Sequence, residues 1–517
     1  MHRSTVWLSL LWILLPGVAA AQSSGAKPIT DALIEKSATA TLPEFVQLLS
    51  IPNVSSVPAD IQKNTAMLDT LFQKRGFRTT VWPNNGRPLL FAELPGPDPA
   101  KKTILFYMHL DGQPVTPSEW DQESPFTPTL KRKTESAKWE TLPIEQLYGA
   151  HPDRELRVFA RSAGDDKGPI GMFLSAVDAM RAAGREPAIN VKVVLDPEEE
   201  GGGAVGLRSF VKERTSVMRA DGLVVFDGPM GEQNKPRIEF GFRGGVNAQI
   251  IVFGPKNEVH SGNYGNYSPN PMQMLARLVG NMKDDDGRVT IPGFYDSVKL
   301  SPDVQQKISA VPFDAAALNK RLGIAAPEAV GHNLTEALMY PTLTLSRMTA
   351  GSLGPNGKVV PFVGAVIPAV ASADIAIRTV PETPSEFLRP VITRYVESQG
   401  FHLLTAPPTD EERAKYRKMA MVTVSNGSAG AKTDMNSALG DWMSRAYRGA
   451  FGSDPEKLPL LGGGLPVGAI IDGLKVPFVI SPLANGDDNQ HTSNENLRLG
   501  NYIDGAKSIL ALLQEKF

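Results

Sequence analysis

The chain has 517 residues, a net charge of −2 at pH 7 and a hydrophobic content of 42%, which is enough for more than one core, so we expect two domains. Its dispersed Lys and Arg residues give no electrostatic footprint for nucleic acid or for an anionic membrane, so partners should be small or locally recognised. Because Cys is absent, disulfides and thiolate metal sites are excluded, and any metal ion must be held by His and carboxylate side chains.

The first 21 residues are typical of a secretory signal peptide. His2 and Arg3 precede an apolar run at 6–15, and small residues follow at 19–21. The apolar run is shorter than the ~20 residues that a membrane span needs. We therefore expect cleavage near residue 21, export to the periplasm or the medium, and no stable membrane span afterwards; a retained anchor is the alternative.

From residue 59 to 255, predicted helices alternate with short apolar strands, a pattern typical of an α/β sheet core. From 246 to about 404 the predicted order is β-α-β-β-α-β, ending in a short strand near Leu403, which indicates a ferredoxin-like insertion. The α/β pattern then resumes and ends in a helix from about Leu497. The expected boundaries are a signal peptide at 1–21, a first domain at 22–240 and 406–517, and an inserted domain at 241–405.

Two stretches are predicted to be loops. Residues 118–157 are polar and rich in Pro, Lys and Glu, while residues 301–330 hold helical fragments without a strong period.

The first candidate motif is an apolar run at 104–108 that ends in His109, with Asp111 and Pro114 behind it. Residues two apart in a strand face the same side, so the Asp111 carboxylate can reach the His109 imidazole. A metal-bound His commonly donates its second ring N–H to a carboxylate, which fixes its tautomer and orientation. The alternative is a His–Asp pair in an ordinary turn.

The second motif places Asp165, Asp166 and Lys167 between glycines, just before a predicted helix. A carboxylate has two oxygens and can bridge two cations, which a monodentate imidazole cannot, and Asp165 is the better bridge candidate. A turn rich in Gly and Asp that caps the helix is the alternative.

The third motif puts four acidic residues among five positions, Asp196 and 198–200, after an apolar strand. Carboxylates crowded at a buried strand end repel one another unless a cation neutralises them or they bind protons. Next to a metal, one Glu can be a ligand and its neighbour a general base for water. A solvated acidic loop is the alternative.

Two more candidates follow. Asp227 ends another apolar strand, as an Asp does in many α/β proteins. His491 lies in a loop of Asn, Asp, Ser and Thr before the last predicted helix. An N-capping loop with an incidental His is the alternative for His491.

The order and chemistry of these motifs resemble the two-zinc exopeptidase and deacylase family that includes carnosine dipeptidase, glutamate carboxypeptidase, acetylornithine deacetylase and succinyl-diaminopimelate desuccinylase. The shared signatures are an H-x-D-x-x-P strand end, a D-[DN]-K-G turn, an acid-x-x-E-E-x-G loop and a late His in HTSNE, and they cover nearly the whole chain after the signal peptide. The resemblance implies an α/β, zinc-exopeptidase-like catalytic domain with a central mixed sheet, interrupted by a ferredoxin-like α+β dimerisation (lid) domain.

The resemblance also implies two divalent ions, zinc in the first place, with manganese or cobalt as alternatives. The implied ligands are His109, Asp165 and Asp227 for one ion, and Asp165, Glu200 and His491 for the other. Glu199 would be the general base, and Asp111 would orient His109. Asp rather than Glu at position 227 resembles the dipeptidase and aminopeptidase branch.

The inserted domain carries two further signatures. The segment EVHSGNYG resembles the family's D-x-H-S-G-x-x-G, which implies that His260 reaches the active site of the partner subunit in a homodimer and helps to hold the oxyanion. DIAIRTVP resembles I-R-x-V-P, which implies that Arg378 grips the substrate's terminal carboxylate through a bidentate contact. A surface His and a strand-edge Arg are the alternatives.

Two positions depart from the family pattern. Ser162 follows Arg161 where relatives often have Gly, and Gly464 replaces the Ser of the family's G-G-S-[IL]-P segment. The missing hydroxyl leaves recognition at the substrate's carboxylate end open, whereas the metal ligands are unaffected.

These features predict a metal-dependent exopeptidase for dipeptides or short peptides with a free carboxylate. An amidohydrolase that acts on N-acyl amino acids is the alternative within the enzyme class. A non-catalytic exported binding protein is the alternative outside it, and the intact ligand set together with Glu199 counts against that reading.

Overall fold

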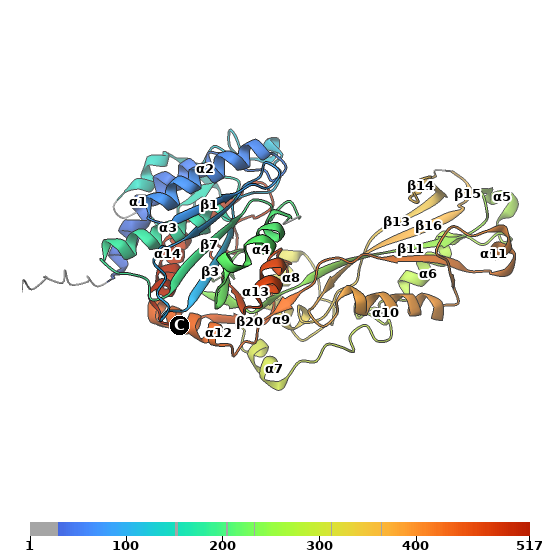
Figure 1. Cartoon of the computed structure of the whole chain (residues 1–517). Coiled ribbons are helices and arrows are strands. Elements are labelled where there is room, and N and C mark those ends of the chain that lie inside the picture. The colour runs from blue at the N-terminus through green and yellow to red at the C-terminus, as the bar shows by residue number, and fades with distance from the viewer. Residues whose placement is uncertain (1–28, 150–152, 203–204, 232, 312, 363) are drawn as a thin grey trace, which may run out of the picture.

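The computed structural model describes residues 29–149, 153–202, 205–231, 233–311, 313–362 and 364–517. Figure 1 shows an α/β body and, beside it, an elongated second body built on long strands. The predicted signal peptide at residues 1–21 lies outside the described residues. Among the residues described, no helix combines the length and the apolar character needed to cross a membrane.

The α/β body is built on an eight-stranded mixed sheet. Its strands, in spatial order, are β1 (Arg78–Trp82), β2 (Leu89–Glu93), β7 (Asn190–Asp196), β3 (Thr103–His109), β8 (Gly222–Val225), β21 (Phe478–Ile480), β9 (Arg237–Glu239) and β20 (Glu456–Leu458). β7, β3, β8 and β21 run parallel to one another, whereas β2 and β9 pair antiparallel with β7 and β21. The loops that follow the parallel strands therefore meet at one edge of the sheet.

Helices cover both faces of this sheet, because successive strand residues point to opposite sides. On β3, Ile104, Phe106 and Met108 enter one core, while Leu105 and Tyr107 enter the other. The first core includes α1 (Asp31–Leu49), α2 (Pro58–Lys74), α3 (Lys167–Ala182), α12 (Ala438–Phe451) and α14 (Leu499–Gln514). The second includes α4 (Val205–Met218) and α13 (Gly468–Leu474).

The second body holds a six-stranded sheet with helices on one face. In spatial order the strands are β14 (Val359–Pro361), β13 (Thr344–Leu353), β16 (Val370–Thr379), β11 (Gly244–Phe253), β18 (Met419–Val424) and β17 (His402–Leu403). Helices α6 (Pro271–Gly280) and α10 (Ser385–Ser398) share its core. An α/β body interrupted by an α+β unit is the fold class that the sequence predicts, and the prediction is confirmed.

The strand that completes the second sheet is not the expected one. The predicted strand near Leu403 forms only the two-residue β17, at the sheet edge beside β18. β18 pairs along its whole length with β11, although it lies beyond the boundary expected after residue 405. The short helix α11 (Asp410–Lys415) separates β17 from β18. Residues 419–424, which the expected boundaries place in the first domain, thus form a strand of the second sheet.

The two predicted loops also contain regular structure. Residues 118–157 include a hairpin of β4 (Thr129–Lys133) and β5 (Trp139–Leu142), which joins β6 (Arg157–Phe159) and β22 (Asn496–Arg498) in a four-stranded sheet. The ring of Trp139 packs on that of Phe159 with centroids 4.9 Å apart. Most hairpin side chains face solvent, so the hydrophobic alternation that would have revealed the strands is missing.

The described part of residues 301–330 contains two short helices, α7 (Pro302–Ser309) and α8 (Ala315–Leu322). The remaining elements are α9 (Leu334–Ala337), α5 (Ser261–Tyr264), the 3₁₀ helices η1 (Pro117–Glu119) and η2 (Ile144–Tyr148), and the strand pairs β10 (Gly241–Phe242) with β19 (Ala431–Lys432) and β12 (Val259–His260) with β15 (Val366–Ile367).

The buried Lys167 side chain ties the start of α3 to the end of α1. Its Nζ donates hydrogen bonds to the carbonyl oxygens of Leu48, at 2.8 Å, and Ile51, at 2.7 Å. Lys167→Met keeps the volume but leaves two acceptors without this donor, so we expect the free energy of unfolding to fall by about 2–4 kcal/mol. Chemical denaturation measures the change.

The matched control is Lys63→Met, because Lys63 is exposed on α2. It should change the free energy of unfolding by less than about 0.5 kcal/mol. Equal stability of the two variants would contradict the role assigned to Lys167.

Candidate metal centre

Five polar side chains from five separate segments meet at the edge where the parallel strands end. His109 is the last residue of β3, Glu200 follows β7, and Asp227 follows β8. Asp165 precedes α3, and His491 precedes β22 and α14. The sheet edge therefore gathers residues that are almost 400 positions apart in the sequence.

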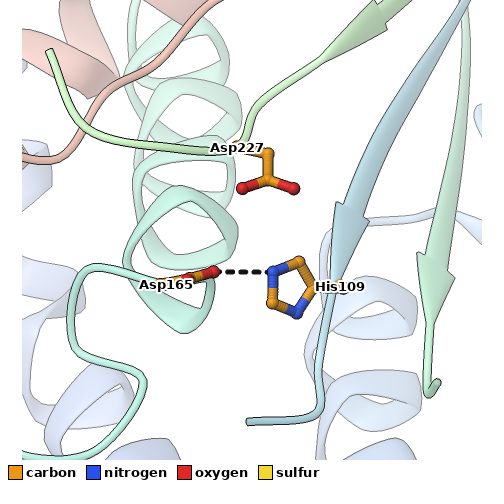
Figure 2. A group of neighbouring side chains, drawn as sticks. All are labelled: His109, Asp165 and Asp227. Atoms are coloured by element: carbon orange, nitrogen blue, oxygen red, sulfur yellow. Dashed lines mark hydrogen bonds and ion pairs between the residues drawn. The ribbon is translucent and has the colours of Figure 1, made fainter. Parts of the chain in front are cut away.

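The first group consists of His109, Asp165 and Asp227, all of which are buried. One potential ligand atom from each lies within 4.8 Å of the other two. Figure 2 shows the three side chains facing one another, with the Nε2 atom of His109 2.8 Å from Oδ1 of Asp165. Asp227 completes the triangle from the loop after β8.

The second group consists of Asp165, Glu200 and His491, again within 4.8 Å. Nε2 of His491 lies 3.1 Å from Oδ2 of Asp165 and 3.2 Å from Oε2 of Glu200. The His491 side chain is 50% exposed, so this group opens to solvent. Asp165 belongs to both groups and offers one oxygen to each.

Burial and crowding shift the protonation of these side chains. Burial and the Asp165 carboxylate raise the pKa of Asp227 to about 7. Hydrogen bonds to Asp165 and Glu200 raise the pKa of His491 to about 10. Burial lowers the pKa of His109, but its contacts with Asp111 and Asp165 outweigh burial and bring the pKa well above its usual value. The crowded carboxylates thus favour a bound proton or a bound cation among these side chains.

The donor set fits divalent transition metals. Each group offers one imidazole nitrogen and two carboxylate oxygens, which suits zinc and also manganese or cobalt. Three protein ligands per ion leave a position open, as in catalytic zinc sites. Oδ2 of Asp227 is buried without a hydrogen-bond partner, and a bound cation would neutralise it.

Asp111 connects His109 to the acidic loop. Nδ1 of His109 lies 3.2 Å from the backbone oxygen of Asp111 and 3.5 Å from its Oδ1 atom. The Asp111 carboxylate also accepts hydrogen bonds from the backbone N–H groups of Glu199, at 3.2 Å, and Glu200, at 3.1 Å. It therefore positions the His ligand and the loop that carries Glu200.

Glu199 lies beside the ligand groups. Burial, together with the carboxylates of Asp227 and Glu200, raises its pKa well above the usual range for Glu. Its carboxyl group therefore interacts electrostatically with residues of both ligand groups.

The fully buried Glu495 holds the turn that carries Asp165. Its Oε1 accepts hydrogen bonds from the backbone N–H groups of Gly164 and Asp165, both at 3.0 Å. Its Oε2 accepts from the Ser162 N–H and from Nη1 of Arg161, both at 2.8 Å. Glu495 was missed from sequence, where the only signal is an acid four residues after His491.

Two amide side chains were missed as well. Nε2 of Gln490 donates to Oδ2 of Asp165 at 2.7 Å, and Nε2 of Gln113 donates to Oε2 of Glu200 at 2.6 Å. Both residues stand next to motif residues, but neither amide carries a spacing signal of its own.

His260, predicted to hold the oxyanion, and Arg378 and Gly464, predicted for the substrate's carboxylate end, are not part of the two ligand groups. His260 is exposed at the end of β12, just before α5, and Figure 1 shows α5 at the far end of the second body. Arg378 is exposed near the end of β16. Gly464 is exposed, and a Cβ atom there would lie 2.8 Å from the backbone oxygen of Arg243.

Comparisons with known proteins agree with this architecture. The family model described as peptidase family M20/M25/M40 matches residues 105–515. A Cys-Gly metallodipeptidase of Candida albicans is 27% identical over 423 residues, which cover 80% of this chain and 78% of the relative. A beta-Ala-His dipeptidase of Rattus norvegicus is 26% identical over 434 residues, which cover 83% of this chain and 80% of the relative.

Solved structures share the fold. An M20 family metallo-carboxypeptidase from Sulfolobus solfataricus gives a TM-score of 0.69 at 23% identity, covering 92% of this chain and 98% of that one. Human carnosine dipeptidase 1 gives a TM-score of 0.64 at 23% identity, covering 94% of this chain and 99% of that one. Both cover the α/β body and the second body together.

The contacts of Glu495 predict a weaker metal site when its charge is removed. In Glu495→Gln one of the two oxygens becomes an NH2 group, which cannot accept hydrogen bonds from backbone N–H donors. We expect the affinity for zinc to fall by about 10–100-fold, as for other groups that orient metal ligands. Competition with a chromophoric chelator measures it.

Glu44→Gln is the matched control, because Glu44 on α1 is a partly buried carboxylate that forms ion pairs with Lys74 and Arg75 at the end of α2. It should leave zinc affinity unchanged. An equal affinity for zinc in Glu495→Gln and the unmodified chain would rule out the positioning role of Glu495.

Proposed function

Because this chain belongs to peptidase family M20/M25/M40 and is a metal-dependent hydrolase, we propose that it is an exported dizinc dipeptidase. The family match confirms the resemblance inferred from the motifs. The proposed substrates are dipeptides or short peptides with a free carboxylate end. The observation that supports this most strongly is the position of Asp165, whose two oxygens face two three-ligand groups.

One cation would be held by His109, Asp165 and Asp227, and the other by Asp165, Glu200 and His491. When bound, the cations would supply a lowered pKa for a water molecule and polarisation of the scissile carbonyl. The side chains of the protein would then have to place the water, move its proton and hold the substrate.

Glu199 is the proposed general base. The Asp111 carboxylate accepts hydrogen bonds from the backbone of both Glu199 and Glu200, so the base and a ligand are fixed by one side chain. Glu199 would take the proton of the attacking water and return it to the leaving amine.

The substrate end would be held by residues of the second body. Arg378 would bind the substrate's carboxylate through its guanidinium fork, beside the segment that carries Gly464. His260 would hold the developing oxyanion. Because His260 is exposed on the part of the second body remote from the α/β body, we propose that it acts in the active site of a partner subunit in a homodimer.

Export is proposed from the N-terminal sequence. The charged start, the apolar run at 6–15 and the small residues at 19–21 support cleavage near residue 21. The protein would then act in the periplasm or outside the cell.

Sharing of Asp165 predicts different metal contents for two Asp→Asn variants. We expect the purified chain to bind two zinc ions. Asp227→Asn changes a ligand of one group and should reduce the content to about one ion, whereas Asp165→Asn changes a ligand of both groups and should leave almost none. Elemental mass spectrometry gives the stoichiometry, and equal content in the two variants would speak against a shared ligand.

The general base can be tested apart from the metals. Glu199→Gln should retain zinc but lose about 10²–10⁴-fold in kcat, because the proton of the attacking water then lacks an acceptor. Hydrolysis of a dipeptide and elemental analysis of the same sample measure both effects. Glu213→Gln on the exposed side of α4 is the control and should keep full activity; near-normal activity in Glu199→Gln would remove Glu199 from the mechanism.

A substrate panel tests the proposed class directly. Dipeptides and N-acetyl amino acids are incubated with the zinc-loaded chain, and mass spectrometry identifies the products. Faster hydrolysis of dipeptides supports the proposal, faster hydrolysis of N-acetyl amino acids indicates a deacylase, and turnover of neither indicates a binding protein.

A further inference from the structure

A cavity of about 610 Å³ lies beside the loops that carry two of the candidate metal ligands. Residues 229–231, which follow Asp227, line one side of it, and Gly486, in the loop that leads to His491, lines it as well. Residues of β9, β20, α8 and α9 line the rest. Its volume is within the range of about 300–1,000 Å³ that is typical of ligand sites. The cavity is thus a separate space next to the candidate metal centre.

Glu239 is a buried carboxylate in the wall of this cavity. It is the last residue of β9, and its side chain is only 3% exposed. Its Oε2 is buried without a hydrogen-bond partner among the described residues. Its Oε1 lies 3.8 Å from Nη1 of Arg237, which is longer than a hydrogen bond. An ionised carboxylate in such a place is stable only when a cation or a hydrogen-bond donor comes close to it.

The charge of Arg237 is balanced mainly by another carboxylate. Nε and Nη2 of Arg237 donate to Oε2 of Glu456 at 3.1 and 2.8 Å. A Cβ at Gly231 would collide with Nη2 of Arg237, so this glycine leaves room for the guanidinium. The inner part of the cavity therefore holds two carboxylates and one guanidinium. The other charged side chains of the lining are exposed and screened by water: Lys235, Asp314 and Arg321.

Apolar side chains line much of the remaining wall. Leu458 and Leu460 contribute from the strand β20 and the residues after it, and Leu318 and Leu338 contribute from the segment that contains α8 and α9. Lysine and arginine side chains combine an apolar stem with a charged end. A side chain of this kind can lay its stem on the leucines while its charge reaches Glu239.

Glu239 also lies near one of the metal ligands. Burial raises the pKa of Glu239 to about 7, Arg237 opposes this rise, and the carboxylate of Asp227 adds to it. Because Asp227 acts on Glu239 electrostatically, the cavity is close to the place where a scissile bond would lie. A side chain next to that bond can therefore enter the cavity.

We propose that this cavity is a subsite for a cationic side chain of the peptide substrate, and that Glu239 binds its ammonium or guanidinium group. The inference rests on the proposed peptidase function and deepens it by naming a class of residue in the substrate. Glu239 is a specificity-determining residue in this proposal. A hydrogen bond between a charged donor and a carboxylate is stronger than one between neutral groups, so the subsite favours lysine or arginine over an uncharged side chain of similar length.

The test compares lysyl-alanine and alanyl-lysine with the same peptides carrying norleucine in place of lysine. Norleucine has the same apolar stem without the ammonium group, and the α-amino group is present in every peptide. For at least one pair we expect the zinc-loaded chain to show a kcat/KM about 10-fold higher for the lysine peptide. In Glu239→Gln this preference should fall to about 2-fold or less, while kcat/KM for the norleucine peptide changes by less than about 3-fold.

Asp314→Asn is the matched control. Asp314 is exposed at the cavity and caps α8 by accepting the backbone N–H of Ala317, and Asn retains a side-chain oxygen for this bond. The variant removes one negative charge and should keep the preference for lysine. Absence of a preference in the unmodified chain would overturn the proposal. An equal fall on the lysine and norleucine peptides in Glu239→Gln would overturn it too, because a structural role affects both.

Binding separates this proposal from the proposed function. Calorimetry on zinc-loaded Glu199→Gln, with and without Glu239→Gln, measures the affinity for both peptides of a pair without turnover. Tighter binding of the lysine peptide, lost when Glu239 is replaced, supports the subsite even if the unmodified chain hydrolyses neither peptide. If Glu239→Gln does not fold, Glu239→Asp, which withdraws the carboxylate by one methylene, is measured instead and should weaken the same preference. An unchanged preference in the variant overturns the proposal.

Discussion

The two oxygens of Asp165 face two different ligand groups, and the candidate metal centre of the α/β body depends on this arrangement. One oxygen contacts His109 from the end of β3, and the other contacts His491 from the loop before the last helix. Glu495 fixes the backbone of the turn through three N–H groups. A buried carboxylate is stable only when positive charge or hydrogen-bond donors lie close to it. The ends of the parallel strands and the C-terminal loop must therefore bring such groups to Asp165.

In the proposed function the second body would hold the substrate, whereas the residues of both ligand groups belong to the α/β body. The chain enters the second sheet directly after Arg243, and the backbone N–H of Arg243 donates a hydrogen bond to the backbone oxygen of Gly463. Arg378 meets this crossing from the neighbouring strand β16. The contact proposed between Arg378 and the substrate's carboxylate would therefore lie near the junction of the two bodies.

The sequence predicted most where chemistry is local. His109, Asp165, Glu200 and Asp227 each end or follow a recognisable apolar strand or turn, so their types and order pointed to a metal site that the structure brings together. Glu495 acts through partners that are remote in sequence, and a single acid carries no spacing signal. The boundary expected after residue 405 falls before β18 for a similar reason, since the pairing of β18 with β11 across a helix and a loop is not a local property.

Anomalous diffraction at the zinc edge, from crystals of the zinc-loaded chain, shows whether two ions share Asp165. Two peaks are expected, on either side of the Asp165 carboxylate. One should contact His109 and Asp227, and the other should contact Glu200 and His491. A single peak, or two peaks that do not share Asp165, would contradict the proposed dizinc centre.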